Sequence, residues 1–146
     1  MTMSSRILVS LTAVVLTVRS SEPQARPSDQ GRSPKEIRTI VIRLQAAVRN
    51  DERRTIATLI VFPLEIKKGP LGVTSVPSVT VFMKVYPSVF TKKLRDALLR
   101  QNPDSVVVRD GTATLAEGRI VIGYRCATAD SRSCTTGVTE VTPYRK

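Results

Sequence analysis

The sequence predicts an α+β domain in which N-terminal helices pack on one face of an antiparallel sheet. Between residues 33 and 60 the apolar residues recur at helical spacing, whereas from residue 105 onward they form short runs separated by glycine turns. The chain has 146 residues, of which 41% are hydrophobic, and a chain of this size can bury a core of its own. We therefore expect a single domain over 34–146.

The first 25 residues have the composition of a secretory signal peptide. Arg6 supplies a positive charge, Ile7–Val18 is an apolar stretch, and the small polar residues Ser20 and Ser21 follow it. At about 1.5 Å of rise per residue, this stretch is too short for a hydrocarbon core of about 30 Å, so a membrane anchor is the weaker interpretation. We expect the protein to be exported to the periplasm or the extracellular space. The cleavage site within 1–25 stays open, and the polar residues over 26–33 predict a disordered linker.

Two helices are expected to open the domain. Ser33 can cap the first helix, Pro34 suits its first position, and Glu36 completes a capping box. The apolar face of this helix comprises Ile37, Ile40, Val41, Leu44, Ala47 and Val48. Asn50 and Asp51 break the helix, and the apolar side of a second, shorter helix comprises Ile56, Leu59 and Ile60.

A strand is expected over 61–68, because Phe62, Leu64 and Ile66 alternate with polar side chains. Pro63 has no N–H to donate, so we expect this strand to begin at an edge of the sheet. The glycines and the proline within residues 67–72 predict a turn.

Residues 73–90 fit two structures. A helical stripe is made by Val79, Phe82, Met83 and Tyr86, whereas the valines of this stretch favour a strand. We favour the helix and leave 76–87 open between the two. Pro87 is expected to end either element.

The remainder of the chain predicts one more helix and then strands. Thr91 can cap the helix, whose apolar face is Leu94, Ala97 and Leu98 and which closes at Asn102 and Pro103. Strands are expected over 106–108, 112–115, 119–124 and 136–141. Gly111 and Gly118 mark the turns between the first three, and consecutive hairpins imply antiparallel pairing.

The chain contains two cysteines, Cys126 and Cys134, and no histidine. In an exported chain, two cysteines so close in sequence are best interpreted as a disulfide, which would stabilise the fold by roughly 2–3 kcal/mol. Reduced thiols are the alternative. The absence of histidine removes the usual general base and most zinc sites, so we expect neither a metal nor a cofactor.

The formal net charge of +11 predicts attraction to anionic surfaces, which salt would weaken. The basic residues are scattered along the chain, and no aromatic side chains are interleaved with them as base-stacking platforms would be. We interpret them as a solvated basic surface, with an anionic envelope surface as the alternative partner, and we expect no specific binding of nucleic acid.

Several local strings occur in a suggestive order: LQAAV at 44–48, FPL at 62–64, FTKKLRDAL at 90–98, QNPD at 101–104 and EG at 117–118. In them the chain resembles small exported bacterial domains of the nuclear transport factor 2-like superfamily. The resemblance implies a cone-like fold, in which helices are wrapped by a curved antiparallel sheet that is open at one end to a pocket. It implies that this pocket is lined by Phe62, Phe82, Tyr86 and Phe90, with plain core packing as the alternative. Dimerisation, which is frequent in this superfamily, is left open.

The chain departs from the family pattern where a catalytic acid is expected. Pro87 follows Tyr86 where an acidic residue is frequent in similar domains, which leaves Glu65 and Asp96 as the candidate general bases. By their spacing both should be solvated charges, and Tyr86 has no evident partner to shift its pKa. The sequence therefore predicts no catalytic residue.

We predict a non-catalytic exported domain that binds a small apolar ligand or a protein partner in a cone-shaped pocket. Two alternatives stay open. One is a vestigial or unusual hydrolase or isomerase that uses Glu65, Tyr86 or Asp96. The other is a basic protein that binds anionic envelope surfaces.

Overall fold

The computed structural model describes residues 33–127 and 133–144. The predicted signal peptide and all of the predicted linker except Ser33 lie outside these residues. The described elements are α1 (Pro34–Arg49), α2 (Arg53–Thr58), β1 (Ile60–Lys67), the 3₁₀ turn η2 (Gly69–Leu71), β2 (Val73–Val76), α3 (Val79–Val89), α4 (Lys92–Arg100), the 3₁₀ turn η3 (Pro103–Ser105), β3 (Val108–Arg109), β4 (Thr112–Leu115), β5 (Ile120–Cys126) and β6 (Cys134–Val141).

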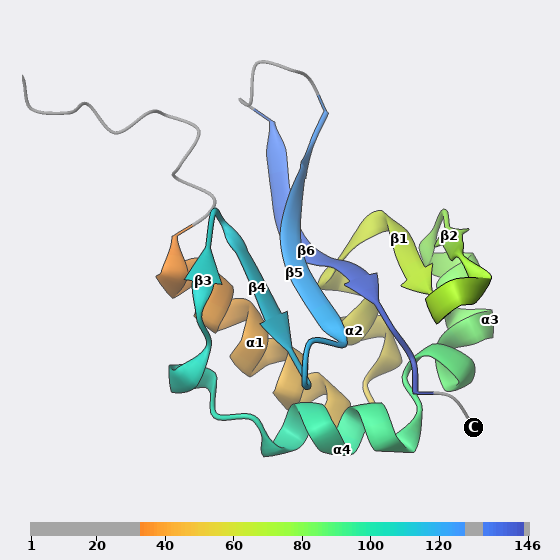
Figure 1. The fold of residues 1–146 in the computed structure, drawn as a ribbon, viewed down its shortest axis with the longest axis horizontal. Helices are drawn as coiled ribbons and strands as arrows, with labels where there is room; N and C mark the ends of the chain where they lie inside the picture. The colour runs from red at the N-terminus through yellow and green to blue at the C-terminus, as the bar shows by residue number, and fades with distance from the viewer. Residues whose placement is uncertain (1–32, 128–132, 145–146) are drawn as a thin grey trace, which may run out of the picture.

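The fold is α+β, with helices packed on one side of a curved sheet that does not close (Figure 1). The strands lie in the order β2-β1-β6-β5-β4-β3, and β2 and β3 form the two edges. All neighbouring strands are antiparallel except β1 and β6, which are parallel. The expectation of a purely antiparallel sheet is thus wrong at one pair. No single hairpin joins these two strands, because the chain runs from β1 through β2, α3, α4, β3, β4 and β5 before it reaches β6, and so long a connection permits parallel pairing.

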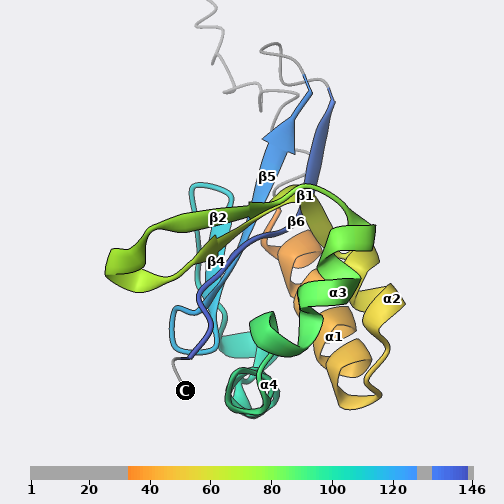
Figure 2. The ribbon, with the colours of Figure 1, turned by 90° about the vertical axis from the view of Figure 1, so that its right-hand side faces the viewer.

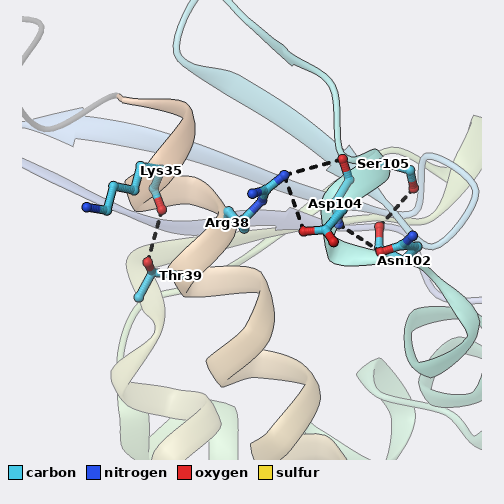
Figure 3. Close-up of polar contacts among 6 residues, drawn as sticks. All are labelled: Lys35, Arg38, Thr39, Asn102, Asp104 and Ser105. Carbon is cyan, nitrogen blue, oxygen red and sulfur yellow. Dashed lines mark hydrogen bonds and ion pairs between the residues drawn. The ribbon is translucent and has the colours of Figure 1, made fainter.

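The first helix is confirmed at both ends. Ser33 Oγ accepts a hydrogen bond from the Glu36 N–H at 3.2 Å, and the helix ends at the cap residue Asn50. The predicted apolar face is buried, with Ile37, Val41 and Leu44 fully inaccessible to solvent. Arg38, on the opposite face, forms an ion pair with Asp104 of η3 at 3.3 Å (Figure 3).

The second helix is confirmed, but it ends before the last two residues of its predicted apolar face. Ile56 lies within α2, whereas Leu59 is the C-cap residue and Ile60 already begins β1. All three are buried. Their shared burial explains the pattern, because both the helix and the start of the strand face the same core.

As a whole, β1 lies between β2 and β6, but its first residues have no partner on the β2 side, which agrees with the prediction from Pro63. The register of β1 with β6 shifts between Ile60 and Glu65, and pairing with β2 starts only at Leu64. Pro63 occupies this irregular segment and is exposed. Its missing N–H is accommodated by a break in the ladder within the sheet.

The ambiguous stretch contains both predicted structures in succession. Residues 73–76 are strand β2, and residues 79–89 are helix α3, which Ser78 caps through its side chain. Pro87 does not end this helix. It is exposed and lies in the last turn, where its missing N–H removes a single hydrogen bond, and the Phe90 N–H still reaches the Tyr86 carbonyl at 2.8 Å.

Two side-chain amides connect the last helix to α1 and to the turn after β4. The Thr91 side chain caps α4 as predicted. Gln45 Nε2 donates to the carbonyls of Leu98 at 2.8 Å and Gln101 at 2.7 Å, and the Gln101 side chain accepts from the Ala116 N–H at 2.7 Å. The carbonyls at the C-terminal end of α4 are thereby satisfied away from water.

The four predicted C-terminal strands are present, with ends that differ by up to two residues. The disulfide between Cys126 and Cys134 is also present and joins the far ends of β5 and β6. None of the helices in the described part of the chain combines the length and the apolar content that a bilayer-spanning segment requires.

Candidate functional site

The four aromatic residues predicted to line a pocket do come together, but as packed core. The Phe82 ring meets three others edge-on, with centroid distances of 6.3 Å to Phe62, 5.7 Å to Tyr86 and 6.1 Å to Phe90. Phe82, Tyr86 and Phe90 are 0%, 2% and 1% exposed. Phe62 is half-buried at the margin. We call these four residues the aromatic cluster; Phe82 and Tyr86 come from α3, Phe90 is its C-cap residue and Phe62 comes from β1.

A groove of about 560 Å³ lies on another side of the same helix. It is enclosed by the β1–β2 hairpin, by α3 and by the C-terminal residues 142–144. In Figure 2 the β1–β2 hairpin extends to the left of α3. None of the residues of the aromatic cluster lines this groove.

The floor of the groove is aliphatic and comes from three elements: Ile66 on β1, Val76 on β2, and Val81, Val85 and Val89 on α3. The three valines of α3 are spaced four residues apart and so share one face of the helix. Val81 and Val85 are only half-buried. Short, branched side chains here leave a hollow that larger ones would fill.

The rim of the groove is cationic. Lys67, Lys68 and Arg119 line it, and no carboxylate does. Lys67 Nζ is neutralised by Glu140 at 2.8 Å. Lys68 is exposed and has no ion-pair partner among the residues that the structure describes. The mouth of the groove therefore carries uncompensated positive charge beside an apolar floor.

Tyr144 forms the C-terminal wall of the groove. Two cations contact its ring, with Lys93 Nζ at 4.5 Å and Arg119 Cζ at 4.4 Å from the centroid. Its hydroxyl donates to Glu117, and this hydrogen bond, followed by burial, raises the pKa of Tyr144 above its usual value. The backbone is held as well, because the Thr142 N–H donates to the Arg119 carbonyl at 2.7 Å.

The candidate catalytic residues do not share a site. Glu65 lies between buried Leu64 and Ile66 on β1, so it faces the side of the sheet away from the core, where Arg125 binds it at 3.1 Å. Asp96 lies on the surface of α4 and pairs with Lys92 at 2.7 Å. This hydrogen bond lowers the pKa of Asp96.

Tyr86 does have a partner, contrary to the expectation from sequence. Its hydroxyl donates to Asp51 Oδ1 at 3.2 Å, and Asp51 also pairs with Arg53 at 3.2 Å and Arg95 at 3.3 Å. Burial, and then the charge of Asp51, raises the pKa of Tyr86. The hydrogen bond from Arg53 lowers the pKa of Asp51. Each shift moves its group further from proton exchange at neutral pH.

A second cavity, of about 370 Å³, lies on the sheet face opposite the helices. It is lined by two carboxylates, Glu65 and Glu140, which are neighbours in the β1–β6 register. Each carboxylate is ion-paired, with Arg125 and with Lys67 respectively. Within 33–127 and 133–144, no group of three or more His, Cys, Asp or Glu residues could hold a metal ion.

Sequence reasoning missed the groove and the residues that shape it most, which are Val81, Val85, Arg119 and Tyr144. The valines carried a signal, since residues 81, 85 and 89 form a stripe of small apolar side chains at helical spacing. Arg119 and Tyr144 carried none, because Arg119 precedes β5 and Tyr144 follows β6, and only the folded chain brings them together.

Comparison of the chain with family models, with curated proteins and with solved structures found no match. The resemblance to the nuclear transport factor 2-like superfamily therefore stays a prediction. The groove beside α3, with its aliphatic floor and cationic rim, is the feature on which a functional argument rests.

Proposed function

We propose that the protein is an exported, non-catalytic domain that binds a small amphipathic anion in the groove beside α3. The observation that carries the proposal is the pairing of an aliphatic floor with two cations at the rim, Lys68 and Arg119, in one cavity of about 560 Å³. Cavities that bind small molecules commonly measure about 300–1,000 Å³ and combine apolar walls with a few polar groups.

The two parts of such a ligand have separate places in the groove. An apolar tail on the floor would remove from water the half-buried surfaces of Val81 and Val85, which favours binding by about 25 cal/mol per Å² of apolar area. An acidic head at the rim would lie near Lys68 and Arg119. A carboxylate or sulfonate there would pair with these cations, which Glu140 does not neutralise because it binds Lys67.

Binding is favoured over hydrolysis or isomerisation because the ionisable residues are dispersed. Glu65, Tyr86 and Asp96 lie on the outer sheet face, in the core and on the surface of α4, and each already has a charged partner. A general base needs to reach a substrate proton within hydrogen-bond distance, and none of the three lines the groove.

Two further parts of the proposal concern origin and location. The Cys126–Cys134 disulfide supports export, since disulfides persist in oxidising compartments. The α+β fold, with an opening between α3 and the sheet, supports our proposal that the chain is a small member of the nuclear transport factor 2-like superfamily.

A plug in the groove tests the proposal. Ser88 lines the groove on the exposed side of α3, so Ser88→Trp should fill the cavity without disturbing the core. Thr80→Trp is the matched control, because Thr80 is exposed on the same helix and does not line the groove. The probes are 1-anilinonaphthalene-8-sulfonate, followed by fluorescence, and dodecanoate as its competitor.

We expect the wild type and Thr80→Trp to bind the fluorescent probe and release it to dodecanoate, and Ser88→Trp to bind neither. Arg119→Gln should weaken binding, whereas Arg109→Gln, at an exposed position on β3, should not. Equal binding by the two tryptophan variants would place the ligand elsewhere and refute the proposal. So would a wild type that binds neither probe.

A further inference from the structure

The tip of the β1–β2 hairpin projects from the domain. Figure 2 shows the two strands extending away from the helices and ending in η2. We define the hairpin tip as Lys67, Lys68, Pro70 and Val73, all of which are exposed. Val73 is 57% exposed, which is among the highest values for a large apolar side chain in the described residues.

The hairpin tip combines cations with exposed apolar groups at fixed positions. Lys67 and Val73 are direct partners across the two strands, and the Lys68 N–H donates to the Gly72 carbonyl at 2.8 Å. Gly72 has a φ of 94°, a conformation that side-chain-bearing residues rarely adopt, so the turn depends on glycine here. The lysines and the valine are therefore presented together by a defined turn.

We propose that the hairpin tip docks on an anionic lipid bilayer. Lysines near such a surface are attracted by the negative potential of its headgroups, and small apolar groups beside them can enter the boundary between headgroups and acyl chains. The free charge of Lys68 and the exposed surface of Val73 match these two layers. The net charge of +11 adds long-range attraction of the same sign.

Lipid is favoured over nucleic acid by the composition of the hairpin tip. Single-stranded nucleic acid is bound on aromatic side chains, and the hairpin tip has none. The hairpin tip also consists of few residues, whereas a protein partner would require a broad complementary surface.

Docking at this point would place the groove at the membrane. Lys67, Lys68 and Gly69 belong both to the hairpin and to the lining of the groove. An amphipathic anion could pass from the bilayer into the groove without crossing bulk water. This last step rests on the proposed function, whereas docking of the hairpin tip does not require an occupied groove.

The chain contains no tryptophan, so one introduced tryptophan reports on its own surroundings. In the full chain, Val73→Trp places it at the hairpin tip. Val107→Trp places it at a residue that is 63% exposed beside β3, at the opposite edge of the sheet (Figure 1). The measurement is tryptophan emission with vesicles of phosphatidylglycerol and phosphatidylcholine, with and without brominated acyl chains.

We expect emission of Val73→Trp to shift to the blue and to be quenched by brominated lipid when phosphatidylglycerol is present, and that of Val107→Trp to change little. The proposal would be overturned if vesicles shifted and quenched the emission of Val73→Trp no more than that of Val107→Trp. Equal quenching in pure phosphatidylcholine would also contradict it, because charge would then have no role.

Two charge variants provide a second readout, by co-sedimentation with the same vesicles. Lys68→Gln should weaken binding by about fivefold, the contribution of one basic residue near an anionic surface. Lys35→Gln removes the same charge from an exposed position at the start of α1 and should have a smaller effect. Equal weakening by both, or stronger capture of Val73→Trp by single-stranded DNA than by vesicles, counts against docking.

Failure here and failure of the proposed function are distinguishable. If the hairpin tip does not meet lipid but Ser88→Trp and Thr80→Trp still differ in binding dodecanoate, the groove binds a ligand that arrives through water. If the hairpin tip meets lipid and those two variants do not differ, docking stands and the groove proposal fails.

Discussion

Helix α3 presents two apolar faces with opposite outcomes. On one face Phe82, Tyr86 and Phe90 interlock and leave almost no exposed surface. On the other, Val81 and Val85 stay half-buried along a groove of about 560 Å³. Both faces consist of apolar residues at helical spacing, and they differ in the size of the side chains.

The difference teaches that the large apolar residues of α3 fill the core, whereas its small apolar residues line a cavity. Aromatic rings adopt edge-to-face contacts that stabilise the core beyond the area they bury. The smaller valines line a hollow with Ile66 and Val76. The pocket therefore lies beside the aromatic cluster that the sequence had suggested as its lining.

The largest expected effect comes from truncating the filled face. Phe82→Ala removes the central ring of the aromatic cluster, and we expect it to lower the free energy of unfolding by about 3–5 kcal/mol. Val81→Ala, one residue away on the groove face, should cost only about 1 kcal/mol because Val81 is half-buried. Urea denaturation measures both. Equal losses would show that the two faces are packed alike.

A smaller effect on stability distinguishes Tyr86, in the aromatic cluster, from Tyr144, in the wall of the groove. Tyr86→Phe removes a hydrogen bond to Asp51 at the margin of the core and should cost about 1 kcal/mol. Tyr144→Phe removes the hydrogen bond to exposed Glu117, where water can replace the partner, and should cost less than about 0.5 kcal/mol. Thermal unfolding of the two variants at pH 7 checks the order; the reverse order would mean that the C-terminal wall is the more tightly held.

The smallest effect concerns acid. The folded state lowers the pKa of Asp51 below 3.8, so its ionised form adds stability that is complete above about pH 5 and is lost as the pH falls through the folded-state pKa. Asp51→Asn should therefore be less stable than wild type at pH 7, and the difference should shrink toward pH 3. Asparagine tolerates the φ of 51° at this position.

Asp110→Asn is the matched control for that experiment, since Asp110 is exposed, has a φ of 50° and makes no ion pair among the described residues. Denaturant curves at several pH values give the stability differences. A gap between wild type and Asp51→Asn that stays constant down to pH 3 would contradict the assignment of Asp51 as the charged partner of Tyr86.

Local signals allowed much of the fold to be predicted from the sequence. The Ser33 cap and the stripe from Ile37 to Val48 define α1 because both depend on neighbours within a few residues. Thr91 and the leucines of α4 do the same, and the glycine turns divide the last strands.

What the sequence did not reveal depends on contacts between distant segments. The parallel pairing of β1 with β6 joins Ile60 to Val138, and nothing near either residue specifies it. Pro87 is tolerated inside α3 only because it lies in the last turn. Asp51, which seemed only to break a helix, binds Tyr86 and Arg95 from two other helices. The groove requires the hairpin, α3 and Tyr144 at once.

The most direct test of the account is a nuclear magnetic resonance titration of the protein with dodecanoate, observed at valine methyl groups and phenylalanine rings. We predict that the methyl signals of Val81, Val85 and Val89 shift, while the ring signals of Phe82 and Phe90 stay in place. Shifts at the two phenylalanine rings with unmoved Val81 and Val85 would place the ligand within the aromatic cluster and contradict the account.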